Sequence, residues 1–204
     1  MQNLAAGVAQ RLLQINAIKL SPQNPFTWAS GMKSPIYCDN RIVLSYPEAR
    51  TYIIEGFKQK ASEFPAVDKI AGVATAGIPH GALLADKMEM PFIYVRSKAK
   101  GHGRQNQIEG ELKPGEKVLV IEDLISTGGS CLKAVDALKE SGAEVIGVMA
   151  IFTYGFQKAV DAFAQAGIPF ATLSNYDVLV EEAVKANYVT EADIEILQEW
   201  RKRA

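Results

Sequence analysis

Val118–Ser130 reads Val-Leu-Val-Ile-Glu-Asp-Leu-Ile-Ser-Thr-Gly-Gly-Ser, and this stretch decides the fold. Its apolar start, Val118–Ile121, predicts a strand that is buried on both faces of a sheet. Glu122 and Asp123 then place two carboxylates at the carboxyl end of the strand, and Ser126–Ser130 forms a turn rich in hydroxyls and glycine before a helix. This order predicts a phosphate site, because glycines let the backbone approach an anion and a helix amino terminus presents free N–H groups.

The glycine turn matches neither of two common nucleotide-binding motifs. No Gly-Lys-Ser/Thr follows the glycines, as it does in a Walker loop, and the G-x-G-x-x-G spacing of dinucleotide-binding turns is missing. An ordinary turn, with a hydroxyl capping the helix predicted over Cys131–Lys139, would explain Ser126–Ser130 but not the acidic pair. Two carboxylates beside a phosphate cradle suit a ribose phosphate, and ligands bind at the carboxyl ends of strands in such sheets.

The composition is that of one globular domain. The chain has 204 residues, of which 48% are hydrophobic and 22% charged. The net charge of −1 provides no basic field, so no nucleic-acid partner is expected. Cys38 and Cys131 match no metal-binding spacing, and a reducing, cytoplasmic setting is expected. No apolar run reaches ~18 residues and no basic segment precedes an apolar one at the amino terminus, so neither a membrane span nor a signal peptide is expected.

Helix and strand signals alternate along the remaining chain. Helices are predicted over Asn3–Asn16, Ser45–Glu63, Gly81–Lys87 and Gln157–Ala166, with a last one beginning at Thr190. Strands are predicted over Lys69–Ala74, Pro91–Val95, Ala143–Phe152 and Phe170–Leu173. Ser45 and Glu48 have the spacing of a capping box, and Thr190 is predicted to cap the last helix. Strands that alternate with helices predict an α/β fold with a central, mostly parallel sheet flanked by helices.

Two further segments bear on the site. Phe26–Arg41 predicts two short strands around a Ser-Gly-Met-Lys turn, so residues 1–45 are interpreted as a small hood over the ligand site and residues 46–204 as the core of a single domain. Thr75–His80 is a second glycine turn between a strand and a helix and a second potential phosphate contact. His80 is interpreted as a residue of the helix start and not as a catalyst.

Arg96–Glu116 is about twenty residues without apolar periodicity, a length that compact domains rarely keep unless the loop is functional. Its first half carries five basic or imidazole side chains and no acid before Glu109: Arg96, Lys98, Lys100, His102 and Arg104. A solvated, charged hairpin would explain the composition. We prefer a glycine-rich lid that closes over an anionic ligand.

These features together resemble the type I phosphoribosyltransferases. Four hydrophobic residues, two acids and a Thr-Gly-Gly loop, as in Val118–Ser130, are the signature of that family. Within the family, Phe26–Arg41, the Ala-Gly-Ile-Pro turn at Ala76–Pro79, and the loop that runs from Arg96 to Asn106–Gly110 resemble the orotate-specific branch. The similarity covers nearly the whole chain and implies the type I phosphoribosyltransferase fold with a small amino-terminal hood subdomain.

The resemblance also implies a reaction. Orotate and 5-phosphoribosyl 1-diphosphate would give orotidine 5′-monophosphate and diphosphate, in the synthesis of pyrimidine nucleotides. Mg²⁺ would be required, held mainly by the substrate and with no direct protein ligand. The family further implies a homodimer with shared active sites, in which the basic loop reaches the neighbouring subunit's site.

Residue roles follow from matching positions in the family pattern. Lys100 and Asp123 would be catalytic, Ser126 would lie near orotate, and Arg96, Lys100 and His102 would hold the diphosphate. The residues implied to bind 5-phosphoribosyl 1-diphosphate are Arg96, Lys100, His102, Glu122, Asp123, Leu124, Ile125, Ser126, Thr127, Gly128, Gly129 and Ser130.

The chain departs from the family pattern at three places. Ala29 stands where many members have lysine, Thr75-Ala76 where many have Tyr-Lys, and Tyr154 lies near the position of an arginine that contacts orotate in some members. Basic residues available to compensate are Lys33, Arg41, Lys98 and Arg104. The alternatives are a phosphoribosyltransferase for a purine base and a non-catalytic regulator that senses 5-phosphoribosyl 1-diphosphate and binds nucleic acid. The second would require a basic face, and the composition does not favour one.

Overall fold

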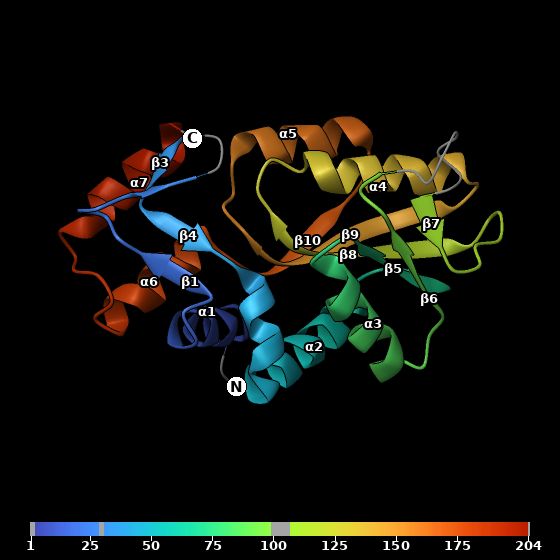
Figure 1. The fold of residues 1–204 in the computed structure, drawn as a ribbon, viewed down its shortest axis with the longest axis horizontal. Helices are drawn as coiled ribbons and strands as arrows, with labels where there is room; N and C mark the ends of the chain where they lie inside the picture. The colour runs from blue at the N-terminus through green and yellow to red at the C-terminus, as the bar shows by residue number, and fades with distance from the viewer. Residues whose placement is uncertain (1–2, 29–30, 99–106, 204) are drawn as a thin grey trace.

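The computed structural model describes residues 3–28, 31–98 and 107–203. Six strands form the central sheet in the order β10-β9-β8-β5-β6-β7 (Figure 1). The strands are β5 (Lys69–Val73), β6 (Phe92–Val95), β7 (Ile108–Glu109), β8 (Lys117–Ile125), β9 (Glu144–Thr153) and β10 (Phe170–Asn175). All neighbours pair in parallel except β6 and β7, which are antiparallel. The predicted mostly parallel sheet is therefore confirmed.

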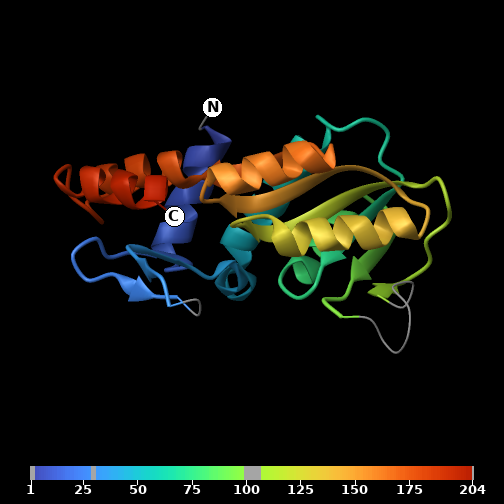
Figure 2. The same ribbon diagram turned by 90° about the horizontal axis from the view of Figure 1, so that it is seen from above.

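Helices cover both faces of this sheet (Figures 1 and 2). One face carries α1 (Leu4–Gln14), α2 (Pro47–Ala61) and α3 (Gly77–Lys87), and the other carries α4 (Gly129–Glu140) and α5 (Gln157–Ala166). The central strand β8 contributes to both cores, because its side chains alternate between the faces. Leu119 and Ile121 pack in the first core, and Val118 and Val120 in the second; all four are completely buried.

The amino-terminal segment forms two small antiparallel sheets and a 3₁₀ helix. β1 (Ile18–Leu20) pairs with β4 (Ile36–Cys38), β2 (Phe26–Thr27) pairs with β3 (Lys33–Ser34), and η1 spans Asn40–Ser45. The strands predicted on both sides of the Ser-Gly-Met-Lys turn are thus present.

The carboxyl-terminal helices α6 (Tyr176–Lys185) and α7 (Asp193–Arg203) lie beside this segment (Figure 1). Trp200 of α7 packs edge-on against Trp28, with ring centroids 5.7 Å apart, and its Nε1 donates to the carbonyl of Lys33 at 3.1 Å. The two ends of the chain therefore support one another. In the described ranges, no helix combines the length and apolarity needed to cross a membrane.

Several boundaries differ from the sequence predictions. α3 begins at Gly77, four residues early, so His80 lies inside the helix and is completely buried. The predicted cap Ser45 belongs to η1, and α2 begins after Tyr46 with no side-chain cap. Thr190 donates instead of accepting: its N–H and its hydroxyl both bond the Asp193 carboxylate, at 2.9 and 2.8 Å.

Candidate active site

A pocket of about 280 Å³ lies at the carboxyl ends of β5 and β8. Two turns form its walls: Ala74–Ala76, which follows β5, and Ser126–Ser130, which follows β8. The remaining lining residues are Glu122, Asp123, Leu124 and Cys131. The two glycine turns that the sequence suggested as phosphate contacts are thus brought to one pocket.

Both helices that leave these turns begin without a side-chain cap. α4 starts after Gly128, which has a φ of +81°, and α3 starts after Ala76. Their first N–H groups are therefore available to an anion, and the positive ends of both helix dipoles lie at the pocket. Apart from Gly129 itself, its chain neighbours and the backbone of its own helix, no described protein atom lies within 4 Å of where a Cβ would sit on Gly129, which leaves its backbone open to a ligand.

α3 approaches β8 very closely. A Cβ placed on Gly77 would meet the carbonyl oxygen of Ile121, so only glycine fits without a shift of the backbone. This contact brings the Thr75-Ala76 turn beside the acidic segment of β8.

The acidic pair is largely withdrawn from water. Glu122 is 6% exposed, and its carboxylate accepts a hydrogen bond from the N–H of Asp123 at 3.0 Å. Burial, with the neighbouring Asp123 charge as a second cause, raises the pKa of Glu122 to about 9. Burial also raises the pKa of Asp123. Without a ligand the pair therefore retains a proton near neutral pH, and sugar hydroxyls would add partners to the hydrogen bonds that the backbone already supplies.

The sequence placed these acids after a strand that ended at Ile121. In the structure β8 continues to Ile125, but its pairing with β5 stops at Ile121, while its pairing with β9 continues to Ile125. The acids therefore lie on a segment that has a strand neighbour on one side only. Ile125 also belongs to this segment, but it is 1% exposed, packs in the core and does not line the pocket.

The amino-terminal segment is joined to the acidic segment of β8 by a side-chain contact that the sequence analysis did not identify. The side-chain amide of Asn40, which is completely buried, donates to the carbonyl of Asp123 at 2.8 Å. Tyr154 stacks on Phe156 with ring centroids 5.2 Å apart and packs against Trp28. Burial raises the pKa of the Tyr154 hydroxyl, and nearby Cys38 and Asp123 add to the rise. This aromatic cluster thus adjoins the acid segment.

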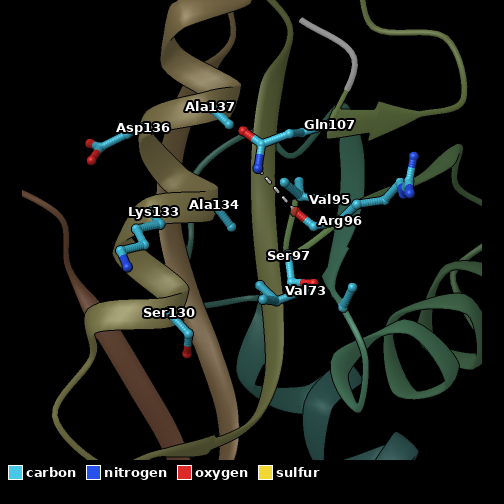
Figure 3. A pocket seen from close by; sticks show the side chains of 11 residues that line it. Val73, Val95, Arg96, Ser97, Gln107, Ser130, Lys133, Ala134, Asp136 and Ala137 are labelled. Carbon is cyan, nitrogen blue, oxygen red and sulfur yellow. Dashed lines mark hydrogen bonds between the residues drawn. The ribbon is translucent and has the colours of Figure 1, made fainter. Parts of the chain in front are cut away.

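Arg96 is not in this pocket. It lines a neighbouring cavity of about 460 Å³ between α4 and the base of the Arg96–Glu116 loop, and Figure 3 shows its side chain directed away from Ser130. Its guanidinium lies 3.6 Å from the carboxylate of Glu109, and its carbonyl accepts from the Gln107 side chain at 3.3 Å. Ala74 and Ser130 line both cavities, so Arg96 lies in a space that adjoins the cradle, with its guanidinium directed away from Ser130.

Other predicted residues fall outside the described ranges. These are Lys100, His102, Arg104 and Ala29. Of the proposed compensating residues, Lys33 donates to the hydroxyl of Thr27 at 2.6 Å, and Arg41 is bidentate to Asp39 at 2.7 and 2.9 Å. The Arg41 guanidinium is the main cause that lowers the pKa of Asp39.

No group of three or more His, Cys, Asp or Glu side chains in the described part of the chain could hold a metal ion. The pocket does contain two carboxyl groups and open space for a ligand's own oxygens. Mg²⁺ prefers such a setting, because it keeps several waters and binds one or two carboxylates together with substrate phosphates. The residues present therefore fit Mg²⁺ that arrives with an anionic substrate.

Comparison with known proteins gives a consistent result. A family profile described as phosphoribosyl transferase domain matches residues 48–165. An orotate phosphoribosyltransferase of Cytophaga hutchinsonii is 57% identical over 98% of this chain and 96% of its own length, and one of Listeria monocytogenes serotype 4b is 56% identical over 96% and 94%. The crystal structure of orotate phosphoribosyltransferase from Aeropyrum pernix superimposes with a TM-score of 0.77 at 26% identity, and the match covers 89% of this chain and 99% of that one.

Proposed function

This chain belongs to the phosphoribosyl transferase domain family and, within it, to the orotate phosphoribosyltransferases, and on that premise we propose how its pocket works. The fold is the type I phosphoribosyltransferase fold, and the chain is a glycosyltransferase-type enzyme. It transfers the phosphoribosyl group of 5-phosphoribosyl 1-diphosphate to orotate, which gives orotidine 5′-monophosphate and diphosphate for pyrimidine nucleotide synthesis.

One observation supports the placement of the substrate: a single pocket joins an acidic pair to two uncapped helix amino termini. The turn Ser126–Ser130 binds the 5′-phosphate through its N–H groups and hydroxyls. Glu122 and Asp123 bind the ribose hydroxyls, and Thr75-Ala76 faces the diphosphate. Ser126 lies toward orotate, together with the aromatic cluster at Tyr154.

The chemistry requires no covalent nucleophile. Cleavage of the bond between the anomeric carbon and the diphosphate leaves positive charge on the ribose, and the carboxylates of Glu122 and Asp123 stabilise that charge as it develops. Lys100 and His102 stabilise the negative charge that grows on the leaving diphosphate, an interaction that is stronger in the transition state than in the ground state. Closure of the Arg96–Glu116 loop excludes water from the reacting carbon.

We propose Mg²⁺ as the cofactor. When bound, it neutralises diphosphate charge, and it is held mainly by substrate oxygens, with Glu122 and Asp123 available to its water molecules. Cys38 and Cys131 are both free thiols, which fits the proposed cytoplasmic location.

The assay of the function follows the orotate absorbance. The protein is incubated with 5-phosphoribosyl 1-diphosphate and Mg²⁺, and with orotate, adenine, hypoxanthine or guanine in turn. Loss of the orotate absorbance, with no turnover of the purines and none after chelation of Mg²⁺, supports the proposal. Turnover of a purine alone would replace it with the purine-base alternative. Binding of 5-phosphoribosyl 1-diphosphate without turnover of any base would favour the regulator.

We also propose a homodimer with shared sites. Arg96 points away from its own cradle and lies on the same loop as Lys100, which suits a loop that serves the neighbouring subunit. A 1:1 mixture of Lys100→Ala and Asp123→Asn subunits tests this. If the two residues serve one site from different subunits, random reassortment restores about a quarter of wild-type activity. If each site is built within one subunit, the mixture stays as inactive as its components.

A further inference from the structure

The described hydrogen bonds include one that ties the amino-terminal segment to the acidic segment of β8. The side-chain Nδ2 of Asn40 donates to the carbonyl oxygen of Asp123 at 2.8 Å, across 83 positions of sequence. Asn40 is completely buried, so water does not compete for this bond. The bond therefore holds the backbone firmly at Asp123, which carries one of the two proposed ribose-binding carboxylates.

The amide of Asn40 is held in one orientation. Its Oδ1 accepts from the Cys38 thiol at 3.4 Å, while its Nδ2 bonds Asp123. Burial and the nearby carboxylates of Asp123 and Asp39 raise the pKa of the Cys38 thiol, so that group stays protonated and remains a donor. A rotated amide would bring its oxygen against the Asp123 carbonyl and would lose that bond.

The recipient of this bond lies on a part of β8 that has a strand neighbour on one side only. β8 pairs with β5 only as far as Ile121, and beyond this residue its strand neighbour is β9 alone. Asn40 therefore adds an anchor to a segment that has lost one of its two strand neighbours. The same short stretch of chain carries β4, which adjoins the aromatic cluster at Tyr154.

We propose that Asn40 is a positioning residue of the phosphoribosyl transfer: its amide fixes the Asp123 backbone, and through it the acidic pair, relative to the amino-terminal segment. This inference rests on the proposed function. A misplacement of about 1 Å at such a contact is enough to lower a rate by ~10²-fold, so the loss should be larger than a stability defect alone explains.

Two variants of nearly the same size test this role. Asn40→Leu removes donor and acceptor, and Asn40→Asp keeps the acceptor but presents a carboxylate to the Asp123 carbonyl. Both are expected to lower kcat/KM for 5-phosphoribosyl 1-diphosphate by about 10- to 100-fold. The matched control is Ser174→Ala. Ser174 is also buried, and its hydroxyl donates to a backbone carbonyl far away in the sequence, that of Ala5, at 2.9 Å. Ser174 does not line the pocket. This variant should lose a similar amount of thermal stability and keep kcat/KM within about twofold of wild type.

A pH profile separates positioning from general damage. A protonated carboxyl can donate where a carboxylate cannot, and burial beside two acids raises its pKa. The defect of Asn40→Asp should therefore diminish as the pH falls from about 9 to about 6, whereas that of Asn40→Leu, measured relative to wild type, should stay constant.

The outcomes distinguish two failures. If wild type turns over orotate but both Asn40 variants keep its kcat/KM, or if their losses match that of Ser174→Ala, the positioning role is refuted and the proposed function stands. If wild type itself does not turn over orotate, the proposed function has failed. Should Asn40→Leu not fold, the comparison of Asn40→Asp at the two ends of the pH range decides alone, and an unchanged defect would overturn the proposal.

Discussion

The buried imidazole of His80 should make the enzyme sensitive to acid, and its replacement should remove part of that sensitivity. The side chain is completely buried in α3, and neither ring nitrogen has a hydrogen-bond partner in the described part of the chain. Burial lowers its pKa from 6.5 to about 4. Because the folded pKa is below the unfolded one, the unfolded chain binds the proton more readily. Stability is therefore present above pH 6.5 and is lost as the pH falls toward 4.

The size of the effect follows from those two pKa values. Relative to pH 7, the single proton lowers the unfolding free energy by about 0.7 kcal/mol at pH 6 and by about 1.8 kcal/mol at pH 5. His80→Leu and His80→Gln should both avoid this loss, since neither side chain titrates. His80→Leu should also be at least as stable as wild type at pH 7.5, because it removes ring nitrogens that are buried without partners.

Urea unfolding of wild type and both variants at pH 7.5, 6 and 5 measures the differences. Carboxylates that titrate in all three proteins cancel when variants are compared with wild type at each pH. A difference in unfolding free energy that does not change with pH would refute the buried neutral imidazole. Turnover should stay within about twofold, because His80 does not line the pocket. A large loss of turnover in a variant that remains folded would instead give His80 a role in the chemistry.

Four further substitutions test the pocket and the close contact of α3 with β8 beside it. Lys100→Ala should lower turnover by ~10²–10³-fold while the far-ultraviolet circular dichroism stays that of wild type, and near-normal turnover would refute the proposed lid. Asp123→Asn should raise KM for 5-phosphoribosyl 1-diphosphate, and unchanged kinetics would remove its contact with ribose. Gly77→Ala should lower the melting temperature, because the new Cβ meets the Ile121 carbonyl, whereas Gly129→Ala should not, since its Cβ enters open space; equal melting temperatures for the two would contradict the close approach of α3 to β8.

Much of the fold could be predicted because local patterns agreed with the tertiary structure. The bounds of α5 match the prediction at both ends, since Gly167 follows it in the left-handed conformation with a φ of +64° and Pro169 lies just beyond. The predicted helix boundaries were wrong where tertiary contacts determine them. α3 starts early because Gly77 can press against β8, a contact that no local pattern around Gly77 contains. The cap predicted at Ser45 failed because a 3₁₀ helix already includes that residue.

The candidate site was predictable where its residues lie on the glycine turns that follow β5 and β8. Glu122 to Ser130 could be interpreted together because one strand and one turn carry them. The role of Asn40 could not be predicted, because its partner is a backbone carbonyl 83 positions away and an asparagine after a short strand is common in turns. Thr153 was missed for the same reason: its hydroxyl donates to the carbonyl of Ile125 at 2.9 Å and steadies the turn from the next strand.

Strand order explains why the two turns meet. From β5 the chain first moves outward to β6 and β7, and it then returns to place β8 on the opposite side of β5. The two connections therefore leave the sheet on opposite faces, with α3 on one and α4 on the other (Figure 1). A crevice must open where adjacent strands diverge in this way, and ligands of α/β proteins bind at such points. β5 and β8 are those strands here. The end of their pairing at Ile121 makes room for the pocket, and it also leaves Glu122 and Asp123 without a hydrogen-bonded strand on the β5 side. This is the physical reason that a buried side chain from outside the sheet, Asn40, is needed there.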